Sequence, residues 1–264
     1  MFLPRKGTTW IRPSLLWLLA FRFKCRLRRR SPDLLPQVAG GLRLHVGAGQ
    51  TLLEGYENLD GYTNPDRPDY FTTDVTKFAR AEALDQVYEP ESVEEIRCHH
   101  LFEHISILDV DRTLQGWNRI LKPGGLVWIE VPDFEGCVRQ ILRLRREADK
   151  EIFWRHIFGS QVAAGEFHHN GFTAGRLIGL LGDYGFEARV AYVQWTRRVP
   201  CKPHMNYPSD LPLPDLTVKA IKVGSPKPEV IHTEWTHTAY RRQYPNPALI
   251  RSSERSGKQN DHGQ

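Results

Sequence analysis

Apolar and polar residues divide the chain between residues 42 and 223 into segments of two kinds. Short, mainly apolar runs are typical of buried parallel strands. These runs are Leu42–Val46, Tyr56–Asp60, Asp69–Phe71, Glu91–Cys98, Leu126–Val131, Phe186–Val193 and Leu216–Val223. Apolar residues three and four apart predict helices over Lys77–Val87, Asp109–Leu121, Cys137–Phe158 and Thr173–Tyr184. The alternation predicts an α/β, Rossmann-like fold: a seven-stranded, mostly parallel sheet with helices on both faces.

The first connection of this predicted sheet is unusually short. Only six residues separate Gly49 from Tyr56, whereas a βαβ crossover normally needs about 10–12. We therefore expect a short first crossover, with one helical turn or a loop in place of the first helix. The glycines of Gly47-Ala48-Gly49 allow a backbone to approach a ligand closely, and Asp60 ends the next strand. Ligands of such sheets bind beyond the carboxyl ends of the strands, which is where these residues fall.

Composition limits the domain organisation and the compartment. The chain has 264 residues, 40% of them hydrophobic, which suffices for one α/β domain with extensions. We expect a basic, apolar N-terminal extension over residues 1–38, the α/β domain over 39–224 and a polar tail over 225–264. Four cysteines without a Cys-x-x-Cys pair argue against a zinc site or a disulfide scaffold, and favour a cytoplasmic protein.

Charge is concentrated at the N-terminus. Residues 1–30 contain nine Lys or Arg and no acid, so the rest of the chain has a formal charge of −4 although the total is +5. A body of this charge does not indicate nucleic-acid binding. The apolar run Leu15–Phe21 is too short to span a bilayer. One interpretation is peripheral contact of residues 1–30 with anionic lipid at the inner face of the membrane. The alternatives are a helix packed on the domain and a disordered basic leader.

The ordered set of motifs resembles the class I methyltransferases that use S-adenosylmethionine, and is most similar to the type 11 domain. The resemblance runs from about Leu42 to Val223. It depends on the glycine turn, Asn58-Leu59-Asp60, Glu103-His104 and Leu121-Lys122-Pro123-Gly124-Gly125. The chain differs from the family pattern at His45, where an acid is frequent, and at Thr51, where a third glycine is frequent.

The resemblance implies a cofactor site for S-adenosyl-L-methionine. In that site Gly47, Ala48 and Gly49 would line the methionine part, and Asp60 would accept hydrogen bonds from the ribose hydroxyls. Asp74 would reach the adenine amino group, and His99 would flank the ring. Simpler roles remain open for some of them: Asp60 in a turn with Gly61, and Asp74 as a helix cap.

Histidines are the candidate catalytic residues. Transfer of a methyl group to a hydroxyl requires removal of a proton, and histidine titrates near neutral pH. The candidates are His104, which follows the fourth strand, and His168, in a loop that would cover the site. Structural roles for both, such as a Glu103–His104 hydrogen bond, remain open. His100 and His104 have helical spacing around Glu103, but without an apolar helix we expect no metal site.

The function that this pattern favours is methyl transfer from S-adenosylmethionine to a small molecule or a glycan, with a hydroxyl as the acceptor group. A role in polysaccharide biosynthesis is one expectation from this resemblance. The alternative is a non-catalytic methyltransferase fold that serves as a binding or scaffolding protein at a membrane surface. A dehydrogenase is disfavoured because Leu52 stands where Gly-x-Gly-x-x-Gly requires its third glycine.

Overall fold

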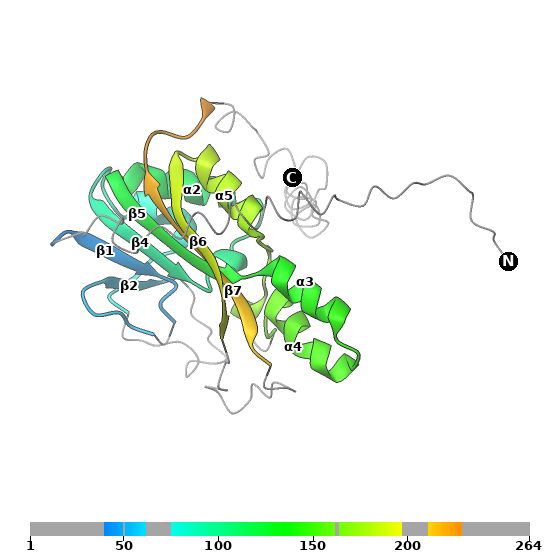
Figure 1. Ribbon diagram of the computed structural model, residues 1–264. Helices are drawn as coiled ribbons and strands as arrows, with labels where there is room; N and C mark the ends of the chain where they lie inside the picture. The colour runs from blue at the N-terminus through cyan, green and yellow to red at the C-terminus, as the bar shows by residue number, and fades with distance from the viewer. Residues whose placement is uncertain (1–39, 50, 62–74, 162–163, 197–210, 229–264) are drawn as a thin grey trace, which may run out of the picture. The chain divides into compact units, whose positions relative to one another are not determined.

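The computed structural model describes residues 40–49, 51–61, 75–161, 164–196 and 211–228 (Figure 1). The chain separates into two units, Met1–Leu35 and Pro36–Gln264, and every described residue belongs to the second. Among the described residues, no helix has the length and apolar character needed to cross a membrane. The predicted boundaries after residues 38 and 224 stay predictions.

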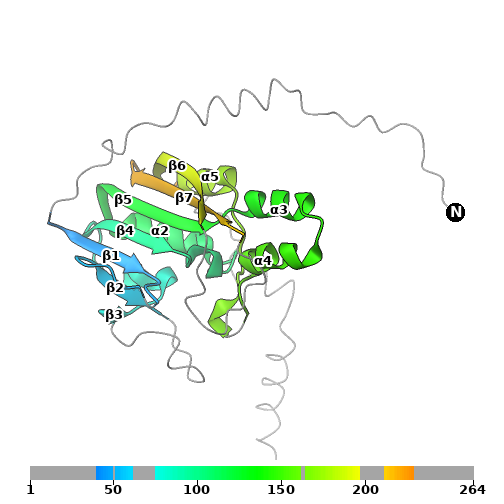
Figure 2. The same ribbon diagram turned by 60° about the horizontal axis from the view of Figure 1, so that its bottom comes forward.

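Seven strands form one sheet in the order β3-β2-β1-β4-β5-β7-β6 (Figures 1 and 2). Their bounds are β1 Leu42–Val46, β2 Glu57–Asp60, β3 Lys77–Phe78, β4 Val93–His99, β5 Leu121–Pro132, β6 Phe186–Thr196 and β7 Leu213–Lys222. The pairs among β1 to β5 are parallel, whereas β7 runs antiparallel to both β5 and β6. The predicted Rossmann-like, mostly parallel, seven-stranded sheet is therefore confirmed.

Strand order reverses between β1 and β4, which are neighbours in the sheet although β2 and β3 lie between them in sequence. In open α/β sheets the crevice beyond the carboxyl ends of such a pair is the usual ligand site. The carboxyl end of β1 leads into Gly47, and that of β4 is His99. Because β7 is antiparallel to β5, its first residues also lie at this edge, where Asp215 pairs with Pro132.

The main core lies on one face of the sheet. Side chains alternate along a strand, so Leu44 and Val46 of β1 share a face with Ile96 and Cys98 of β4. Against this face pack η2 (Ala81–Gln86), α2 (Val110–Ile120) and α5 (Ala174–Asp183). Thr173 caps α5, with its hydroxyl oxygen accepting from the Arg176 amide at 3.2 Å.

A second, smaller core joins α3 (Phe134–Arg143) to α4 (Glu147–Phe158), which lie side by side in both views. Leu213 at the start of β7 packs into this core. Leu213 shares its sheet face with Asp215 and Lys219, the face opposite to the main core. The single helix predicted over Cys137–Phe158 was wrong, since residues 144–146 separate two helices.

Two further predictions differ from the structure near the edge of the sheet. Lys77–Val87 was predicted as a helix, but its first two residues form β3 and a 3₁₀ helix follows. Pairing of Asp60 with Phe78 explains the difference, because it extends the sheet by one short strand. The third strand expected at Asp69–Phe71 lies outside the described residues.

The first crossover is a loop, as its length required. Residues 51–56 between β1 and β2 form turns and irregular backbone. The Asn58 side chain organises this loop: its oxygen accepts from the Leu53 amide at 2.8 Å, and its NH₂ group donates to the Leu53 and Tyr56 carbonyls. Asn58 thus replaces contacts that a helix would make within itself.

Candidate functional site: a glycine turn beside a histidine and carboxylate cluster

The glycine turn after β1 has a conformation that requires glycine. Gly47 and Gly49 have φ of +73° and +52°, in the left-handed region. A Cβ on Gly47 would lie 2.7 Å from the Leu101 side chain, whereas a Cβ on Gly49 would meet none of the described residues within 4 Å. Gly47 is therefore held by packing, and Gly49 presents its backbone to open space.

Asp60 lies directly beside this turn. The Gly49 amide donates to the Asp60 carboxylate at 2.9 Å, and the amides of Gly47 and Ala48 both donate to the Leu59 carbonyl. Asp60 is 8% exposed, so its carboxylate is fixed at the mouth of the turn. A carboxylate there suits a ribose diol, which donates two hydrogen bonds. The assignment of these residues to the sugar and amino-acid parts of S-adenosylmethionine stays a prediction, and Asp74 lies outside the described residues.

His45 has a structural role that explains its departure from the family pattern. Its imidazole is 2% exposed, and its Nδ1 contacts the Asn58 side-chain oxygen at 3.0 Å. That oxygen can only accept, so Nδ1 carries the proton. Burial lowers the pKa of His45 below its usual value of 6.5. A neutral His45 therefore supports the same asparagine that organises the loop before β2.

Stability should consequently fall as the pH drops below 6.5. Above that pH His45 is neutral in both the folded and the unfolded chain; below it the unfolded chain takes up a proton that the folded chain excludes. We expect the free energy of unfolding to decrease from pH 6.5 to 5, and His45→Gln to reduce this slope by up to about 1 kcal/mol per pH unit. Urea denaturation at several pH values measures this dependence of the free energy of unfolding on pH. The exposed His169→Gln is the control, and equal slopes for wild type and His45→Gln would contradict the assignment.

His99 lies at the carboxyl end of β4, next to His45. The two rings meet edge to face at 5.9 Å, and His99 also contacts Trp128 at 5.6 Å between centroids. Burial lowers the pKa of His99 to about 4, so the ring is neutral at pH 7. Its Nε2 is buried and has no hydrogen-bond partner among the described residues. An unpaired polar atom at this edge is consistent with contact to a ligand.

The segment after β4 carries the next candidate residues. His100 has φ of +50°, which is uncommon for a residue with a side chain and frequently found at functional sites. Its Nδ1 lies 3.2 Å from Glu103 Oε1, and its Nε2 lies 3.5 Å from Glu130 and 3.6 Å from Asp215. The imidazole of His100 thus joins three carboxylates from β5, β7 and η3 (Phe102–His104).

Glu103 is the buried centre of this region. Its side chain is 1% exposed, and its Oε2 has no hydrogen-bond partner among the described residues. Burial raises the pKa of the Glu103 carboxyl, but the hydrogen bond with His100 and the nearby imidazoles of His100, His104 and His168 together outweigh it and hold the pKa at about 2. The backbone carbonyl of Glu103 accepts from the amides of His169 and Asn170, which ties η3 to the loop after α4.

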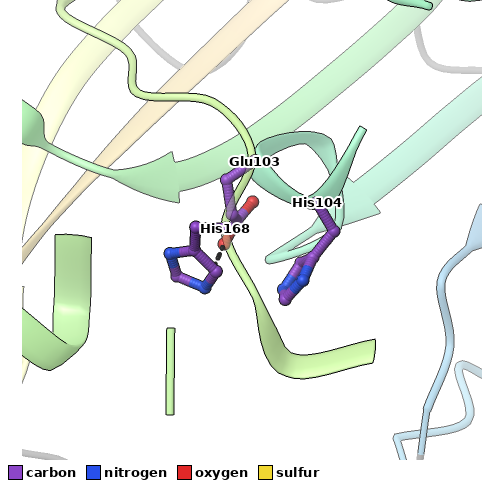
Figure 3. Close-up of side chains that lie close together, drawn as sticks. All are labelled: Glu103, His104 and His168. Atoms are coloured by element: carbon purple, nitrogen blue, oxygen red, sulfur yellow. Dashed lines mark ion pairs between the residues drawn. The ribbon is translucent and has the colours of Figure 1, made fainter. Parts of the chain in front are cut away.

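His104 and His168 lie together beside Glu103 (Figure 3). Their rings meet edge to face at 4.6 Å, and His168 Nε2 lies 3.9 Å from Glu103 Oε1. His104 Nδ1 contacts the Phe167 carbonyl at 3.0 Å, and His168 Nδ1 contacts the Ile157 carbonyl at 3.2 Å. Burial lowers the pKa of His168 to about 4, so this imidazole is neutral at pH 7.

Glu130 and Asp215 belong to a second, neighbouring group. Glu130 accepts from Gln194 at 2.9 Å and from Thr217 at 3.2 Å. Asp215 accepts from Thr196 at 2.7 Å and pairs with His156 of α4 at 2.9 Å. These carboxylates connect β5, β6, β7 and α4 at the carboxyl edge of the sheet.

The structure thus brings the predicted residues into two neighbouring groups. Gly47, Ala48, Gly49 and Asp60 form one, and His104 and His168 lie in the other. Leu101 joins them, since it packs on Gly47 two residues before Glu103. The expected Glu103–His104 hydrogen bond is absent from the described contacts, because Glu103 bonds to His100 and His104 to Phe167.

Sequence reasoning missed His156, Glu130 and Asp215. Asp215 lies just before the predicted strand Leu216–Val223, but β7 begins earlier, at Leu213. Glu130 lies near the carboxyl end of the predicted strand Leu126–Val131, which could have identified it as a site residue. The position of Asp215 depends on the antiparallel pairing of β7.

Comparison with known proteins gives one family match. Residues 62–129, about a quarter of the chain, match the model of the methyltransferase domain family, type 11. The matched segment contains His99, Glu103 and His104 but begins just after Asp60, so the glycine turn lies outside it. No curated protein matches the chain.

Among solved structures, the chain is similar to a SAM-dependent methyltransferase from Methanosarcina mazei, with 15% identity, coverage of 74% of this chain and 98% of that one, and a TM-score of 0.49. A SAM-dependent methyltransferase from Archaeoglobus fulgidus has 14% identity, coverages of 78% and 100%, and a TM-score of 0.44. At this level the likeness says nothing about substrate or site residues.

The family match confirms the resemblance inferred from the sequence motifs. It falls on the segment that carries β3, β4, α2 and most of β5, in a sheet whose order and reversal point are Rossmann-like. Residues 62–129 are therefore part of a type 11 methyltransferase domain, and the cofactor that this family implies is S-adenosylmethionine.

Proposed function

We propose that this protein transfers a methyl group from S-adenosylmethionine to a hydroxyl of a small molecule or glycan. The observation that carries the proposal is the Gly49–Asp60 contact at the β1/β4 reversal point. It combines a backbone open to a ligand with a fixed carboxylate, at the edge where such sheets bind nucleosides.

Each residue of the proposed cofactor site has a distinct task. Gly47 lets the turn pack on Leu101, and Gly49 keeps the approach to the backbone open. Asp60 accepts from the ribose hydroxyls, and His99 offers its ring and unpaired Nε2 near the adenine. The contact of Asp74 with the adenine amino group stays a prediction. The bound cofactor supplies a methyl group on a positively charged sulfur.

The acceptor would approach from the side of His104 and His168. Both rings have Nδ1 bound to a backbone carbonyl, so Nε2 of either neutral imidazole can take the proton of an acceptor hydroxyl. Both side chains are partly exposed, so His104 and His168 both stay candidate bases. Positioning of donor and acceptor in line would supply most of the rate acceleration.

Calorimetric titration of S-adenosylmethionine tests the proposal. We expect binding by the wild-type chain and a loss of about 10- to 150-fold in affinity for Asp60→Ala, since charge-assisted hydrogen bonds contribute about 1.5–3 kcal/mol. Asp60→Asn keeps an oxygen that accepts from the Gly49 amide but removes the negative charge. It therefore shows whether the loss of affinity comes from the ribose contact or from a change in the conformation of the turn. Asp183→Ala is the matched control, because that carboxylate lies at the far end of α5 and pairs with Lys227.

Absence of binding by folded wild-type protein would contradict the enzymatic proposal. That result would favour the non-catalytic alternative, in which the methyltransferase fold serves as a binding or scaffolding protein at a membrane surface. Contact of residues 1–30 with anionic lipid stays a prediction, because these residues lie outside the described part of the chain. A glycan acceptor and a place in polysaccharide biosynthesis are likewise parts of the proposal.

A further inference from the structure

The tautomers of His104 and His168 are set by their backbone contacts. A carbonyl oxygen only accepts hydrogen bonds, so Nδ1 of His104 must donate to Phe167, and Nδ1 of His168 must donate to Ile157. In a neutral imidazole the other nitrogen then has a lone pair and no hydrogen. Both Nε2 atoms are therefore acceptors.

Glu103 places further acceptor atoms at the same point. Its Oε1 lies 3.9 Å from His168 Nε2, too far for a hydrogen bond, and its Oε2 has no partner among the described residues. The side chain is 1% exposed, so bulk water does not solvate this oxygen. A buried carboxylate oxygen without a donor is costly.

One ligand atom from each of these three residues lies within 4.8 Å of the other two. The group consists of two lone-pair nitrogens and a carboxylate, with no donor hydrogen between them. What the arrangement lacks is a positive charge at its centre. A metal ion supplies that charge and accepts all three lone pairs at once.

We propose that Glu103, His104 and His168 bind one divalent transition-metal ion. Imidazole and carboxylate ligands suit zinc, iron, cobalt and nickel better than magnesium. Histidine ligands of metals typically donate their other ring N–H to a carbonyl or carboxylate, which fixes the ring, and both histidines here do so.

The separations require only a small contraction. Metal–ligand distances of about 2.0–2.2 Å place ligand atoms of a tetrahedral site about 3.3 Å apart. The three ligand atoms, which now lie within 4.8 Å of one another, would have to move closer together while each Nδ1 keeps its carbonyl contact. Three protein ligands leave a position open for water or substrate.

The neighbouring group of His100, Glu130 and Asp215 also has three ligand atoms within 4.8 Å, but its carboxylates already have donors. Gln194 and Thr217 bind Glu130, and Thr196 binds Asp215. Those contacts would have to be rearranged around an ion. Glu103 Oε1 also contacts His100, but Glu103 Oε2 has no partner among the described residues, and this free oxygen selects the Glu103 group.

The proposal departs from the expectation of no metal site, which considered His100 with His104. The loop after α4 instead brings His168 beside His104. Binding of the ion does not depend on methyl transfer. An Nε2 atom that holds an ion cannot accept a proton, so the metal-ligand role and the base role of these histidines exclude each other.

Cobalt(II) titration of the untagged, chelator-treated full chain tests the site. We expect one equivalent to bind with visible absorption typical of low coordination number, and zinc but not magnesium to displace it. His104→Gln and His168→Gln should each weaken binding by about tenfold or more. His169→Gln is the matched control, because this neighbouring histidine is exposed and lies outside the cluster.

Thermal melts of each variant confirm that it is folded. If Glu103→Gln fails to fold, His104→Gln still decides the question, since its ring is partly exposed. The proposal is wrong if folded wild-type protein binds no stoichiometric cobalt or zinc. It is equally wrong if both histidine variants bind as wild type does, or if His169→Gln weakens binding to the same extent. Calorimetry with S-adenosylmethionine is independent of these outcomes, so failure of the metal site and failure of the cofactor site are distinguishable.

Discussion

Replacement of Trp117 by alanine should lower the free energy of unfolding by about 3–5 kcal/mol, the usual cost of removing a large buried aromatic side chain. Trp117 is fully buried on α2 and packs against Phe102 with 5.6 Å between ring centroids. Its indole N–H donates to the Ala81 carbonyl at 2.9 Å. The substitution therefore opens a cavity between α2, η2 and η3 and removes the indole donor from the Ala81 carbonyl.

Urea denaturation monitored by circular dichroism measures this loss. Trp117→Phe keeps most of the volume and should cost clearly less, with part of the cost due to the lost hydrogen bond. Trp154→Ala is the matched control, because that ring is 42% exposed on α4. A loss of under 1 kcal/mol for Trp117→Ala would show that the ring does not pack as described.

Alanine at the two glycines of the turn should separate stability from cofactor binding. At Gly47 an alanine combines a left-handed backbone with a contact of 2.7 Å to Leu101, and we expect a loss of about 2–4 kcal/mol in stability. At Gly49 the backbone is also left-handed, but the Cβ meets open space, so the loss should be about 1 kcal/mol.

Binding should show the opposite sensitivity at Gly49. Its new methyl group would occupy the space through which S-adenosylmethionine approaches, and we expect about tenfold weaker binding, which corresponds to 1.4 kcal/mol. Denaturation and calorimetry on both variants measure the two quantities. Equal stability losses would contradict the packing of Gly47, and unchanged affinity in Gly49→Ala would place the cofactor elsewhere.

Much of the fold was predictable because its strands carry local signals. Leu42–Val46 was predicted with its exact bounds, and Asp60 was placed at the end of β2, since apolar runs and following turns are short-range features. The predicted helix over Asp109–Leu121 differs by one residue at each end. The break within the helix predicted after Cys137 was not predictable, because residues 144–146 continue the basic helical composition.

Only the site residues that lie at the end of a strand could be predicted from the sequence. Gly49 was recognised because it closely follows β1, and Asp60 because it ends β2; the structure joins them by a hydrogen bond. The contact of His104 with His168 depends on a loop 63 residues further along the chain, which binds back to Glu103. No local sequence pattern predicts that this loop contacts Glu103. Nor does any local pattern predict that β7 places Asp215 at the same edge of the sheet.

The looped first crossover affects which ligands the glycine turn favours. In dinucleotide-binding sheets the turn leads into a helix, whose N-terminal dipole attracts the pyrophosphate. Here residues 51–56 form turns, so within the described part of the chain no helix dipole points at Gly49. Among the described residues, it is instead the carboxylate of Asp60 that places a charge beside Gly49. The local electric field is therefore unfavourable to a phosphate anion and favourable to a ligand that carries a cationic sulfur.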